Sequence, residues 1–422
     1  MNERSVQSQV GILSVIGLGY IGLPTAAMFA STGLKTVGVD ISRRAVDAIN
    51  EGRAHIEEGN LDELVERCVT AGHLSAVMSP VAADAFIIAV PTPVGHDDQH
   101  SPDISYVLAA GRSIAPVLAK GNLIILESTS PVGTTGALAS LLAELRPDLS
   151  FPQQAGESAD VCLAYCPERI IPGQMLKELV ENDRIIGGMT VRCAERASSL
   201  YRMFVRGVCH LTSDRTAEMV KLAENSFRDV NIAFANELSM ICDHLGINVW
   251  DVIEFANRHP RVSILRPGAG VGGHCIAVDP WFIVASAPER ARIIRTAREV
   301  NDTKPHHVVA QVEQALALQR PDAKVACLGL AYKPDVDDFR ESPSLEIATM
   351  LTARYGDRVL VCDPYAHALP ESEVQQRRLH VVDTADALER ADVVAVLVPH
   401  SSFRSFPLPH DKVVVDPVGF WN

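Results

Sequence analysis

Residues 12–22 read ILSVIGLGYIG, a short apolar run that leads directly into three glycines with the spacing GxGxxG. Such glycines permit a tight turn, the close approach of a pyrophosphate and the packing of a helix on a strand. The N-terminus of that helix would offer amide N–H groups and positive potential to phosphate oxygens. The stretch therefore predicts a strand, a turn and a helix at a dinucleotide. The residues expected to line it are Gly17, Gly19, Tyr20, Ile21 and Gly22.

An acidic residue after the next apolar run makes this motif more specific. Asp40 ends residues 35–40, KTVGVD, where a carboxylate accepts the ribose 2′-hydroxyl of NAD and repels the 2′-phosphate of NADP. Arg43 and Arg44 follow it closely, and arginines in this region sometimes hold the extra phosphate. A packing turn without a ligand would explain the glycines but not Asp40. We therefore expect NAD as the cofactor, with Arg44 beside it.

Apolar, β-branched runs alternate with helical stretches, such as 103–119 and 133–146, in the first half of the chain and again near its end. Such runs are typical of parallel strands that are buried on both faces and joined by crossover helices. The predicted fold class is α/β, with two Rossmann-like, doubly wound parallel-sheet domains. The runs are residues 12–17, 35–40, 85–91, 122–129 and 161–166 in the first half, and 324–332, 358–364, 392–399 and 412–417 near the end.

Between these two parts the pattern becomes helical. Residues 214–245 are amphipathic and contain no glycine or proline, so they predict one long helix that begins near Ser213 or Asp214 and ends at Gly246. More helix is expected over 249–258 and 291–305. A chain of 422 residues is too long for a single core. We expect an NAD-binding domain at 1–212, a central helical domain at 213–318 and a second Rossmann-like domain at 319–422.

Composition excludes several classes of partner. A net charge of -14 argues against general nucleic-acid binding, because no basic surplus is available to neutralise phosphates. No run approaches the roughly 20 apolar residues that a membrane span needs, and residues 1–10 lack the apolar segment of a secretory signal. Nine cysteines are scattered without CxxC spacing. We expect a reduced, cytoplasmic protein without a metal site, a nucleic-acid partner or a membrane partner.

Two loops at the expected carboxyl ends of strands carry hydroxyl groups. Thr92 lies between two prolines, and Thr129 lies in the stretch 128–131, STSP. Because ligands of open α/β sheets bind at these ends, Thr92 could bond the cofactor, and Thr129 could bond a ligand or a water molecule. Ordinary turn chemistry explains each of them equally well when it is taken alone.

A single cysteine lies inside a cluster of glycines, in GAGVGGHCIAVDP at residues 268–280. Either the backbone turns tightly there for packing, or a ligand approaches the sulfur of Cys275 closely. On the long helix, Lys221, Asn225 and Arg228 are spaced to share one face. A solvated surface is the usual explanation for such a face. A dehydrogenase with a glycine-framed cysteine, however, has a use for a lysine that stabilises an oxyanion.

Together these segments resemble the UDP-glucose/GDP-mannose dehydrogenase family. The resemblance covers essentially the whole chain, and it is closest to members that act on UDP-N-acetyl-D-mannosamine in bacterial surface-polysaccharide synthesis. His274 and Pro172 depart from the pattern of the UDP-glucose members, which have serine and often a second glutamate at these positions. The motifs that carry the resemblance are GLGYIG, PTP, ESTSPVGT, CPERIIPG, KLAENSFRDVN, HPRV, GVGGHCIAVDP and AYKPDVDDFRESP.

The resemblance implies a four-electron oxidation of a sugar C6 alcohol to a carboxylate, with two NAD consumed and a thiohemiacetal and thioester formed on the enzyme. Cys275 would be the nucleophile, and Lys221 and Asn225 would stabilise oxyanions. Asp279 would position or deprotonate water, which Thr129 would orient, and Glu168 would be the base of thioester hydrolysis. Glycines beside the nucleophile would let the nucleotide sugar lie against the backbone.

The resemblance also implies residues that hold the ligands. Lys333 would reach the UDP-sugar in the third domain, and Arg340 would bind the cofactor pyrophosphate, where a bidentate guanidinium fits phosphate well. Arg261 would reach the substrate of a neighbouring subunit, so that a homodimer built on the long helix shares its active sites. The substrate-binding set is Glu168, Arg169, Lys221, Asn225, Arg228, Arg261, Gly272 and Lys333.

Other functions remain open at this point. UDP-N-acetylglucosamine and UDP-glucose are the rival substrates within the family. A two-electron dehydrogenase of the hydroxyacid type would share the Rossmann-plus-helical plan, but it would not need Cys275 or a third domain. A non-catalytic sensor would bind NAD or a nucleotide sugar and would form no NADH.

Overall fold

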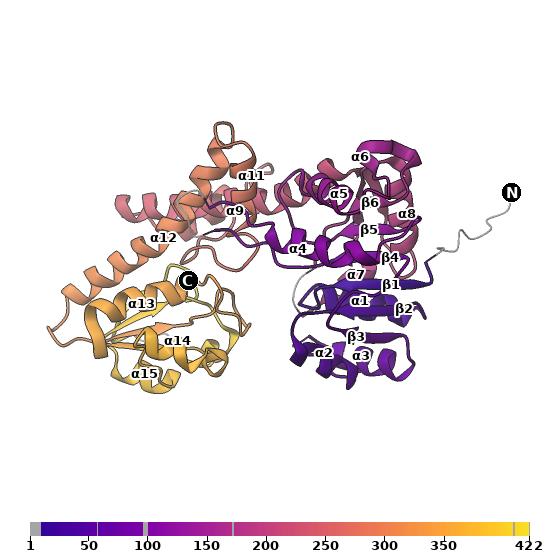
Figure 1. Cartoon of the computed structure of the whole chain (residues 1–422). Coiled ribbons are helices and arrows are strands. Elements are labelled where there is room, and N and C mark those ends of the chain that lie inside the picture. The colour runs from indigo at the N-terminus through magenta and orange to yellow at the C-terminus, as the bar shows by residue number, and fades with distance from the viewer. Residues whose placement is uncertain (1–9, 57, 96–99, 171–172, 408–409, 422) are drawn as a thin grey trace. The chain divides into compact units, whose positions relative to one another are not determined.

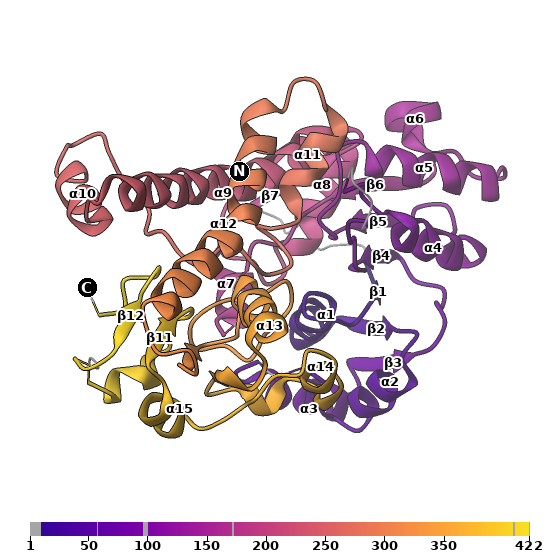
Figure 2. The ribbon, with the colours of Figure 1, turned by 90° about the vertical axis from the view of Figure 1, so that its left-hand side faces the viewer.

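The structure is a computed structural model, and it describes residues 10–56, 58–95, 100–170, 173–407 and 410–421. The chain forms two compact units (Figures 1 and 2). The first unit holds Met1–Ala223 and Trp281–Ser286, and the second holds Glu224–Pro280 and Ala287–Asn422. Each unit has its own sheet.

An eight-stranded sheet forms the centre of the first unit, in the order β3-β2-β1-β4-β5-β6-β7-β8. All five strands predicted for this part of the chain are present, and from β3 to β6 all neighbours are parallel. The strands are β1 (Ile12–Ile16), β2 (Lys35–Val39), β3 (Leu74–Val77), β4 (Ala85–Ile88), β5 (Leu123–Leu126), β6 (Cys162–Tyr165), β7 (Arg184–Gly188) and β8 (Cys209–Ser213).

The last two strands depart from the predicted all-parallel sheet. β7 pairs antiparallel with β6, with Tyr165 opposite Gly187, and β8 is parallel to β7. After β6 the chain does not cross back over the sheet before it enters β7, and strand–helix alternation in the sequence does not reveal this. Arg184, the first residue of β7, consequently lies at the edge where β5 and β6 end.

Helices cover both faces of this sheet, because alternate strand residues point to opposite faces. Leu13 and Val15 of β1 pack with α1, α3 and α8 in one apolar cluster, whereas Phe86 and Ile88 of β4 pack with α4 and α5 in another. The helix expected at 103–119 is shorter, as α4. The helices are α1 (Gly22–Ser31), α2 (Arg43–Asn50), α3 (Leu61–Thr70), α4 (Ser105–Ile114), α5 (Thr134–Leu145), α6 (Pro152–Ala155), α7 (Met175–Glu181) and α8 (Val191–Tyr201).

The long helix α9 spans Asp214–Leu245, as the sequence predicts. At its start the Ser213 hydroxyl accepts the amide N–H of Thr216 at 3.2 Å, and Gly246 follows its end with a φ of 68°. A side-chain cap at the start and a left-handed glycine after the end are the usual boundaries of a helix. Its residues up to 223 belong to the first unit and the rest to the second.

A four-stranded parallel sheet forms the centre of the C-terminal part of the second unit, in the order β10-β9-β11-β12. All four predicted strands are present, as β9 (Val325–Leu328), β10 (Val359–Cys362), β11 (Val393–Val396) and β12 (Val413–Val415). The remaining helices are α10 (Val249–Ala256), α11 (Asp279–Ser286), α12 (Arg292–Ala317), α13 (Pro343–Tyr355), α14 (Glu371–Gln376) and α15 (Thr384–Arg390).

Helix α12 is longer than predicted, because it continues through Pro305 to Ala317. A proline inside a helix removes one backbone hydrogen bond and normally ends the helix. Here Val308, Val309 and Val312 on the next two turns are buried in the apolar core beneath β9. Their burial outweighs the lost hydrogen bond. In the described part of the chain, we find no helix long and apolar enough to cross a membrane.

Candidate active site

The glycine turn after β1 is tightly packed on one side and open on another. Gly17 has a φ of 89°, and a Cβ added to it would lie 2.5 Å from the carbonyl oxygen of Ala89. A Cβ on Gly22 would lie 1.8 Å from the carbonyl oxygen of Gly17. A Cβ on Gly19, in contrast, would meet no heavy atom within 4 Å. The first and last glycines therefore serve packing, and only the middle one faces open space.

The groups around this turn fit a dinucleotide. Among the described residues no side chain caps the N-terminus of α1, and the positive end of a helix favours a phosphate. Two of its first three residues offer no amide, since Leu23 already donates to the carbonyl oxygen of Gly19 at 3.1 Å and residue 24 is proline. Asp40 accepts the amide N–H of Leu18 at 2.9 Å and that of Ser42 at 2.8 Å, and its carboxylate is only half-buried. Tyr20 and Arg44 are exposed. Of the predicted cofactor residues, those of the glycine turn and Asp40 therefore lie together at one corner of the sheet.

The loops that follow β4 and β5 are joined by hydrogen bonds. The Thr92 hydroxyl donates to the carbonyl oxygen of Thr129 at 2.5 Å. The Ser128 hydroxyl accepts the amide N–H of Val90 at 2.9 Å and donates to the Val90 carbonyl at 2.7 Å. Both predicted threonines therefore lie together at the carboxyl edge of the sheet, and Thr92 already uses its hydroxyl to hold the two loops together.

Glu168 belongs to a buried group of charged side chains at the same edge. Its Oε2 lies 2.7 Å from Arg184 Nη2, and its Oε1 accepts the amide N–H of Arg169 at 2.7 Å. Glu127, immediately after β5, is fully buried, with Oε1 3.8 Å from Arg184 Nη1. Burial and then the charge of Glu168 raise the pKa of Glu127 to about 8. Arg169, a predicted substrate residue, donates from its guanidinium to the carbonyl oxygen of Asp183.

Sequence reasoning did not single out Glu127 as a site residue, and it also missed a second buried glutamate. Glu218 of α9 accepts the amide N–H groups of Gly133 and Thr135 at 2.6 and 2.8 Å, together with the Thr135 hydroxyl at 2.8 Å. Burial raises the pKa of Glu218. A carboxylate at a helix N-terminus is stabilised by the helix dipole. Glu218 thereby fixes the start of α5 and the loop before it, which contains Thr129.

The cysteine loop ends in a single turn that leads into α11. The carbonyl oxygen of Cys275 accepts the amide N–H groups of Val278 and Asp279 at 3.1 and 2.8 Å, and the Cys275 side chain is half-buried. Asp279 is buried, and its Oδ2 accepts the Asn225 amide at 2.5 Å. The structure thus brings the predicted nucleophile, Asp279 and Asn225 together in the second unit.

The predicted polar face of α9 is buried only at its first two positions. Lys221 and Asn225 are both 8% exposed, whereas Arg228 is exposed. Burial of a lysine and an amide is uncommon unless their polar atoms have a use. Lys221 and Asn225 are therefore the stronger candidates for chemistry, and Arg228 shares their face without sharing their burial.

The glycines of the cysteine loop have protein neighbours in the second unit. Added Cβ atoms would lie 2.7 Å from Pro343 at Gly270, 2.4 Å from the carbonyl oxygen of Glu341 at Gly272, and 2.9 Å from the Tyr332 ring at Gly273. The sequence suggested that they make room for a nucleotide sugar. The close approach of residues 332–343 is sufficient reason for all three.

Residues 332–343 carry the predicted ligand contacts of the third domain. Arg340 donates to both carboxylate oxygens of Asp338, at distances from 2.6 to 3.1 Å. The pKa of Asp338 is lowered: burial alone would raise it, but the hydrogen bonds from Arg340 outweigh that effect. Arg340 is therefore engaged with a neighbour on its own loop, while Lys333 is exposed. Arg261 is also exposed, in the loop after α10.

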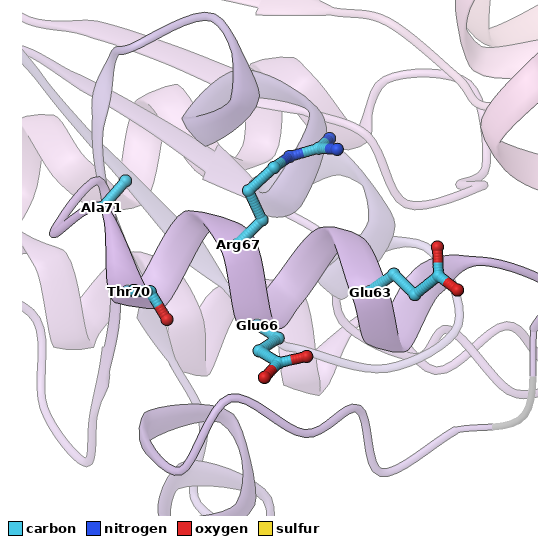
Figure 3. A pocket seen from close by; sticks show the side chains of 5 residues that line it. All are labelled: Glu63, Glu66, Arg67, Thr70 and Ala71. Atoms are coloured by element: carbon cyan, nitrogen blue, oxygen red, sulfur yellow. The ribbon is translucent and has the colours of Figure 1, made fainter.

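Neither of two open spaces on the surface coincides with these residues. A hollow of about 400 Å³ lies along α3, lined by exposed side chains, and Figure 3 shows Arg67 leaving the helix in a different direction from Glu66. Another, of about 220 Å³, is lined by Ser239, Asp243 and Lys304, among others. Burial lowers the pKa of Lys304 to about 8. Among the described residues, no cluster of potential metal ligands is present. Pro172, one of the departures noted in the sequence, lies outside the described residues.

Comparison with known proteins accounts for nearly the whole chain. Residues 12–205, 215–303 and 326–422 match, in turn, the NAD binding domain, the central domain and the UDP binding domain of the UDP-glucose/GDP-mannose dehydrogenase family. A UDP-N-acetyl-D-mannosamine dehydrogenase of Escherichia coli is 57% identical over 419 residues, which cover 97% of this chain and 99% of that protein. An NDP-N-acetyl-D-galactosaminuronic acid dehydrogenase of Ralstonia nicotianae is 55% identical over 422 residues, covering 100% and 98%.

Solved structures give the same picture. A UDP-D-ManNAc dehydrogenase from Pyrococcus horikoshii superposes with a TM-score of 0.85 and 39% identity, over 97% of this chain and 96% of that one. The UDP-N-acetyl-mannosamine dehydrogenase of Staphylococcus aureus superposes with a TM-score of 0.82 and 43% identity, over 97% and 95%. The chain is therefore similar to nucleotide-sugar dehydrogenases in sequence and in fold.

Proposed function

Because the chain belongs to the UDP-glucose/GDP-mannose dehydrogenase family along nearly its whole length, we propose that it oxidises C6 of UDP-N-acetyl-D-mannosamine to the carboxylate. The observation that carries the choice of sugar is 57% identity to a UDP-N-acetyl-D-mannosamine dehydrogenase. The chain is an NAD-dependent oxidoreductase with a UDP-binding domain. The product would be UDP-N-acetyl-D-mannosaminuronate, a building block of bacterial surface polysaccharide.

The proposed chemistry passes through a covalent intermediate on sulfur. NAD would serve as the oxidant twice. C6 would lose a hydride and its hydroxyl group a proton to give an aldehyde, the Cys275 thiolate would add to that aldehyde, and loss of a second hydride from the resulting thiohemiacetal would leave a thioester. Lys221 and Asn225 stabilise the oxyanions. Water then hydrolyses the thioester, with Glu168 as the base. Asp279 and Thr129 position this water.

The geometry of the second unit supports this assignment. Cys275 and Asp279 lie on one backbone turn, and Asp279 is held by Asn225 at 2.5 Å. A nucleophile and its neighbours need fixed positions, because small misplacements lower rates steeply. A two-electron hydroxyacid dehydrogenase would have no use for this arrangement, and a non-catalytic sensor would not need it either.

A panel of substrates tests the choice of sugar. We expect NADH formation to be fastest with UDP-N-acetyl-D-mannosamine, compared with UDP-N-acetylglucosamine, UDP-N-acetylgalactosamine and UDP-glucose. The galacto epimer belongs in the panel because a relative at 55% identity is named for an N-acetylgalactosaminuronic acid product. Two NADH per sugar would support the four-electron reaction, and one would favour the hydroxyacid-type alternative. Faster turnover of any other sugar would contradict the proposed substrate.

Glu168→Gln tests the thioester. The amide keeps the shape of the side chain but cannot take a proton from water, so both hydride transfers should proceed while hydrolysis fails. We expect a burst of about two NADH per active site and then little turnover. Intact-mass measurement should show a sugar adduct on the protein. The matched control is the same variant with Cys275→Ser, which should carry no adduct; a persistent adduct would remove Cys275 as the nucleophile.

A homodimer with shared active sites is the proposed assembly. Phe227, Phe234 and Ile241 recur every seven residues on α9 and are 70%, 54% and 49% exposed, and an apolar stripe of this kind suits helix-on-helix association. The exposed Arg261 would enter the partner's site. Mixing Cys275→Ser with Arg261→Ala should then restore activity that neither variant has alone. Unchanged inactivity of the mixture, with dimers seen by sedimentation, would contradict sharing.

The cytoplasm is the proposed location, and the domain boundaries near 212 and 318 are likewise proposals. Eight of the nine cysteines are buried thiols outside any disulfide, as suits a reducing compartment. Limited proteolysis with mass analysis of the fragments would test the boundaries. Cuts confined to regions far from residues 212 and 318 would contradict them.

A further inference from the structure

The group Glu127–Arg184–Glu168 contains two carboxyl groups and one guanidinium, and we call it the charged cluster. Glu127 follows β5, Glu168 follows β6, and Arg184 begins the antiparallel strand β7. Their side chains are at most 6% exposed. With both carboxyl groups ionised, the cluster would hold one uncompensated negative charge away from water, which is costly. One proton therefore belongs to the folded cluster.

None of the described groups that face Glu127 supplies the missing positive charge. Tyr201 of α8 donates its hydroxyl to Glu127 Oε1 at 3.0 Å, and its ring lies 4.5 Å from the Arg184 guanidinium. Cys166 Sγ lies 3.9 Å from Arg184 Nη1, and burial raises the pKa of this thiol to about 12, so it stays neutral. Thr25 of α1 is a further, uncharged neighbour of the Glu127 carboxyl group. The charge must be balanced within the cluster.

The contacts decide which carboxyl group keeps the proton. Glu168 accepts hydrogen bonds of 2.7 Å from both Arg184 and the amide of Arg169, and each bond favours a carboxylate. Glu127 lies farther from Arg184, at 3.8 Å, and its Oε2 has no hydrogen-bond partner among the described residues. Burial and the neighbouring Glu168 also raise the pKa of Glu127 to about 8. The proton stays on Glu127 at neutral pH.

We propose that Glu127 is a positioning residue for thioester hydrolysis, which keeps the one proton of the charged cluster and so leaves Arg184 to hold Glu168 as an ionised base. The inference rests on the proposed role of Glu168. A neutral Glu127 neither repels the Glu168 carboxylate nor draws Arg184 away from it. When Glu127 loses its proton at high pH, two carboxylates compete for one guanidinium, and hydrolysis slows.

The pH dependence of turnover tests this role. In the parent, kcat should fall roughly tenfold from pH 7 to pH 9, as Glu127 ionises, and the slowed hydrolysis should reveal a burst of NADH at pH 9. Glu127→Gln imitates the protonated side chain and cannot ionise. Its ratio of kcat at pH 9 to kcat at pH 7 should therefore stay near one, with no burst.

Tyr201→Phe is the matched second variant, because it changes the proton affinity of Glu127 without touching Glu168. The Tyr201 hydroxyl favours the ionised form of Glu127, so its removal should shift the alkaline fall of kcat to higher pH. A merely structural role would give no such pair of changes. An alkaline fall at the same pH in the parent and both variants would overturn the inference.

Infrared spectroscopy tests the buried proton without any turnover. The parent at pH 7 should show a carbonyl band of a protonated carboxyl group that disappears on titration to pH 9 and is missing from Glu127→Gln. Absence of this band from the parent overturns the inference, however active the enzyme is. If the band behaves as expected and no UDP-sugar yields NADH, the buried proton stands and the proposed function fails instead.

Discussion

In each of the two sheets, the first strand ends in a glycine turn that is held by an aspartate from the neighbouring strand. We call this arrangement a corner, and its surroundings differ between the two sheets. In the first unit Gly17 follows β1 with a φ of 89°, and the next amide donates to Asp40 at 2.9 Å. In the second unit Gly329 follows β9 with a φ of 90°, and the next amide donates to Asp363 at 2.6 Å. In both, a carboxylate at the end of the neighbouring strand fixes a left-handed glycine turn.

The carboxylates of Asp40 and Asp363 differ in their burial and in the number of their hydrogen-bond partners. Asp40 is half-buried, and among the described residues its second oxygen accepts the backbone amide of Ser42 at 2.8 Å. The side chain of Asp363 is fully buried, and it also accepts the amide of Ala331 and the Nε2 of His400, both at 3.1 Å. The same backbone device therefore stabilises both turns. Only the first corner leaves its carboxylate within reach of a ribose hydroxyl.

Removing the buried carboxylate should have the largest effect on stability. Asp363→Ala strips the partner from His400 and from three backbone amides at a fully buried site, which costs about 3–5 kcal/mol of the free energy of unfolding. Urea titration followed by far-UV circular dichroism measures this loss. Asp40→Ala is the control, and at its more exposed corner the loss should be about 1 kcal/mol. Equal losses at the two corners would break the comparison.

Asp40→Ala should act on the cofactor instead. It removes the acceptor of the ribose 2′-hydroxyl and the charge that repels a 2′-phosphate, so NAD binding should weaken by about 1–3 kcal/mol. Discrimination between NAD and NADP should also be lost. Calorimetric titration with both dinucleotides measures the two effects, and UDP binding by the same variant serves as the control. NAD affinity equal to that of the parent would show that Asp40 does not hold the ribose.

The buried corner at Asp363 should also be sensitive to acid. Burial opposes the shift, but His400 and the backbone amides lower the pKa of Asp363 below its ordinary 3.8. A depressed carboxyl pKa gives stability that is complete above the unfolded pKa and is lost as the pH falls through the folded one. Below about pH 4 the parent should lose up to about 1.4 kcal/mol per pH unit from this group. Asp363→Asn should show a shallower slope in urea titrations, and an identical slope would contradict the assignment.

The smallest effect on stability is expected at the middle glycine of the first corner. Gly19 has open space around it, so Gly19→Ala should change the free energy of unfolding by no more than about 0.5 kcal/mol. The added methyl group would instead obstruct a pyrophosphate, and NAD should bind less tightly. Gly17→Ala is the control, because its positive φ and its contact with Ala89 make a side chain destabilising. Normal NAD affinity in Gly19→Ala would place the phosphates elsewhere.

Sequence was sufficient where the signal is local. The glycine corner at 17–22, Asp40 and the boundaries of α9 follow from neighbours along the chain, and the structure has them where they were predicted. The second corner also carries a local signal that sequence reasoning did not use. The stretch LGLAY at 328–332 repeats the start of the first corner, and VLVCDP at 359–364 supplies the matching aspartate.

The charged cluster could not be found in this way. Glu127 and Arg184 are 57 positions apart in the sequence, and they meet only because β7 runs antiparallel to β6. Strand direction is set by how the connection returns to the sheet, and alternation of elements does not encode it. The continuation of α12 through Pro305 was missed for a related reason, since it depends on burial against a distant sheet.

The fit between the cysteine loop and residues 332–343 limits how this enzyme can be recombined with its relatives. Three glycines of the cysteine loop pack directly against this segment: Gly270 against Pro343, Gly272 against Glu341 and Gly273 against Tyr332. A side chain on any of these glycines would have to displace its neighbour. A chimera joined near residue 319, between the central and third domains, would combine a cysteine loop from one protein with residues 332–343 from another, and the two surfaces would no longer fit. Residues 268–280 and 332–343 therefore form one packing unit. An exchange of UDP-binding domains between relatives has to transfer both segments together.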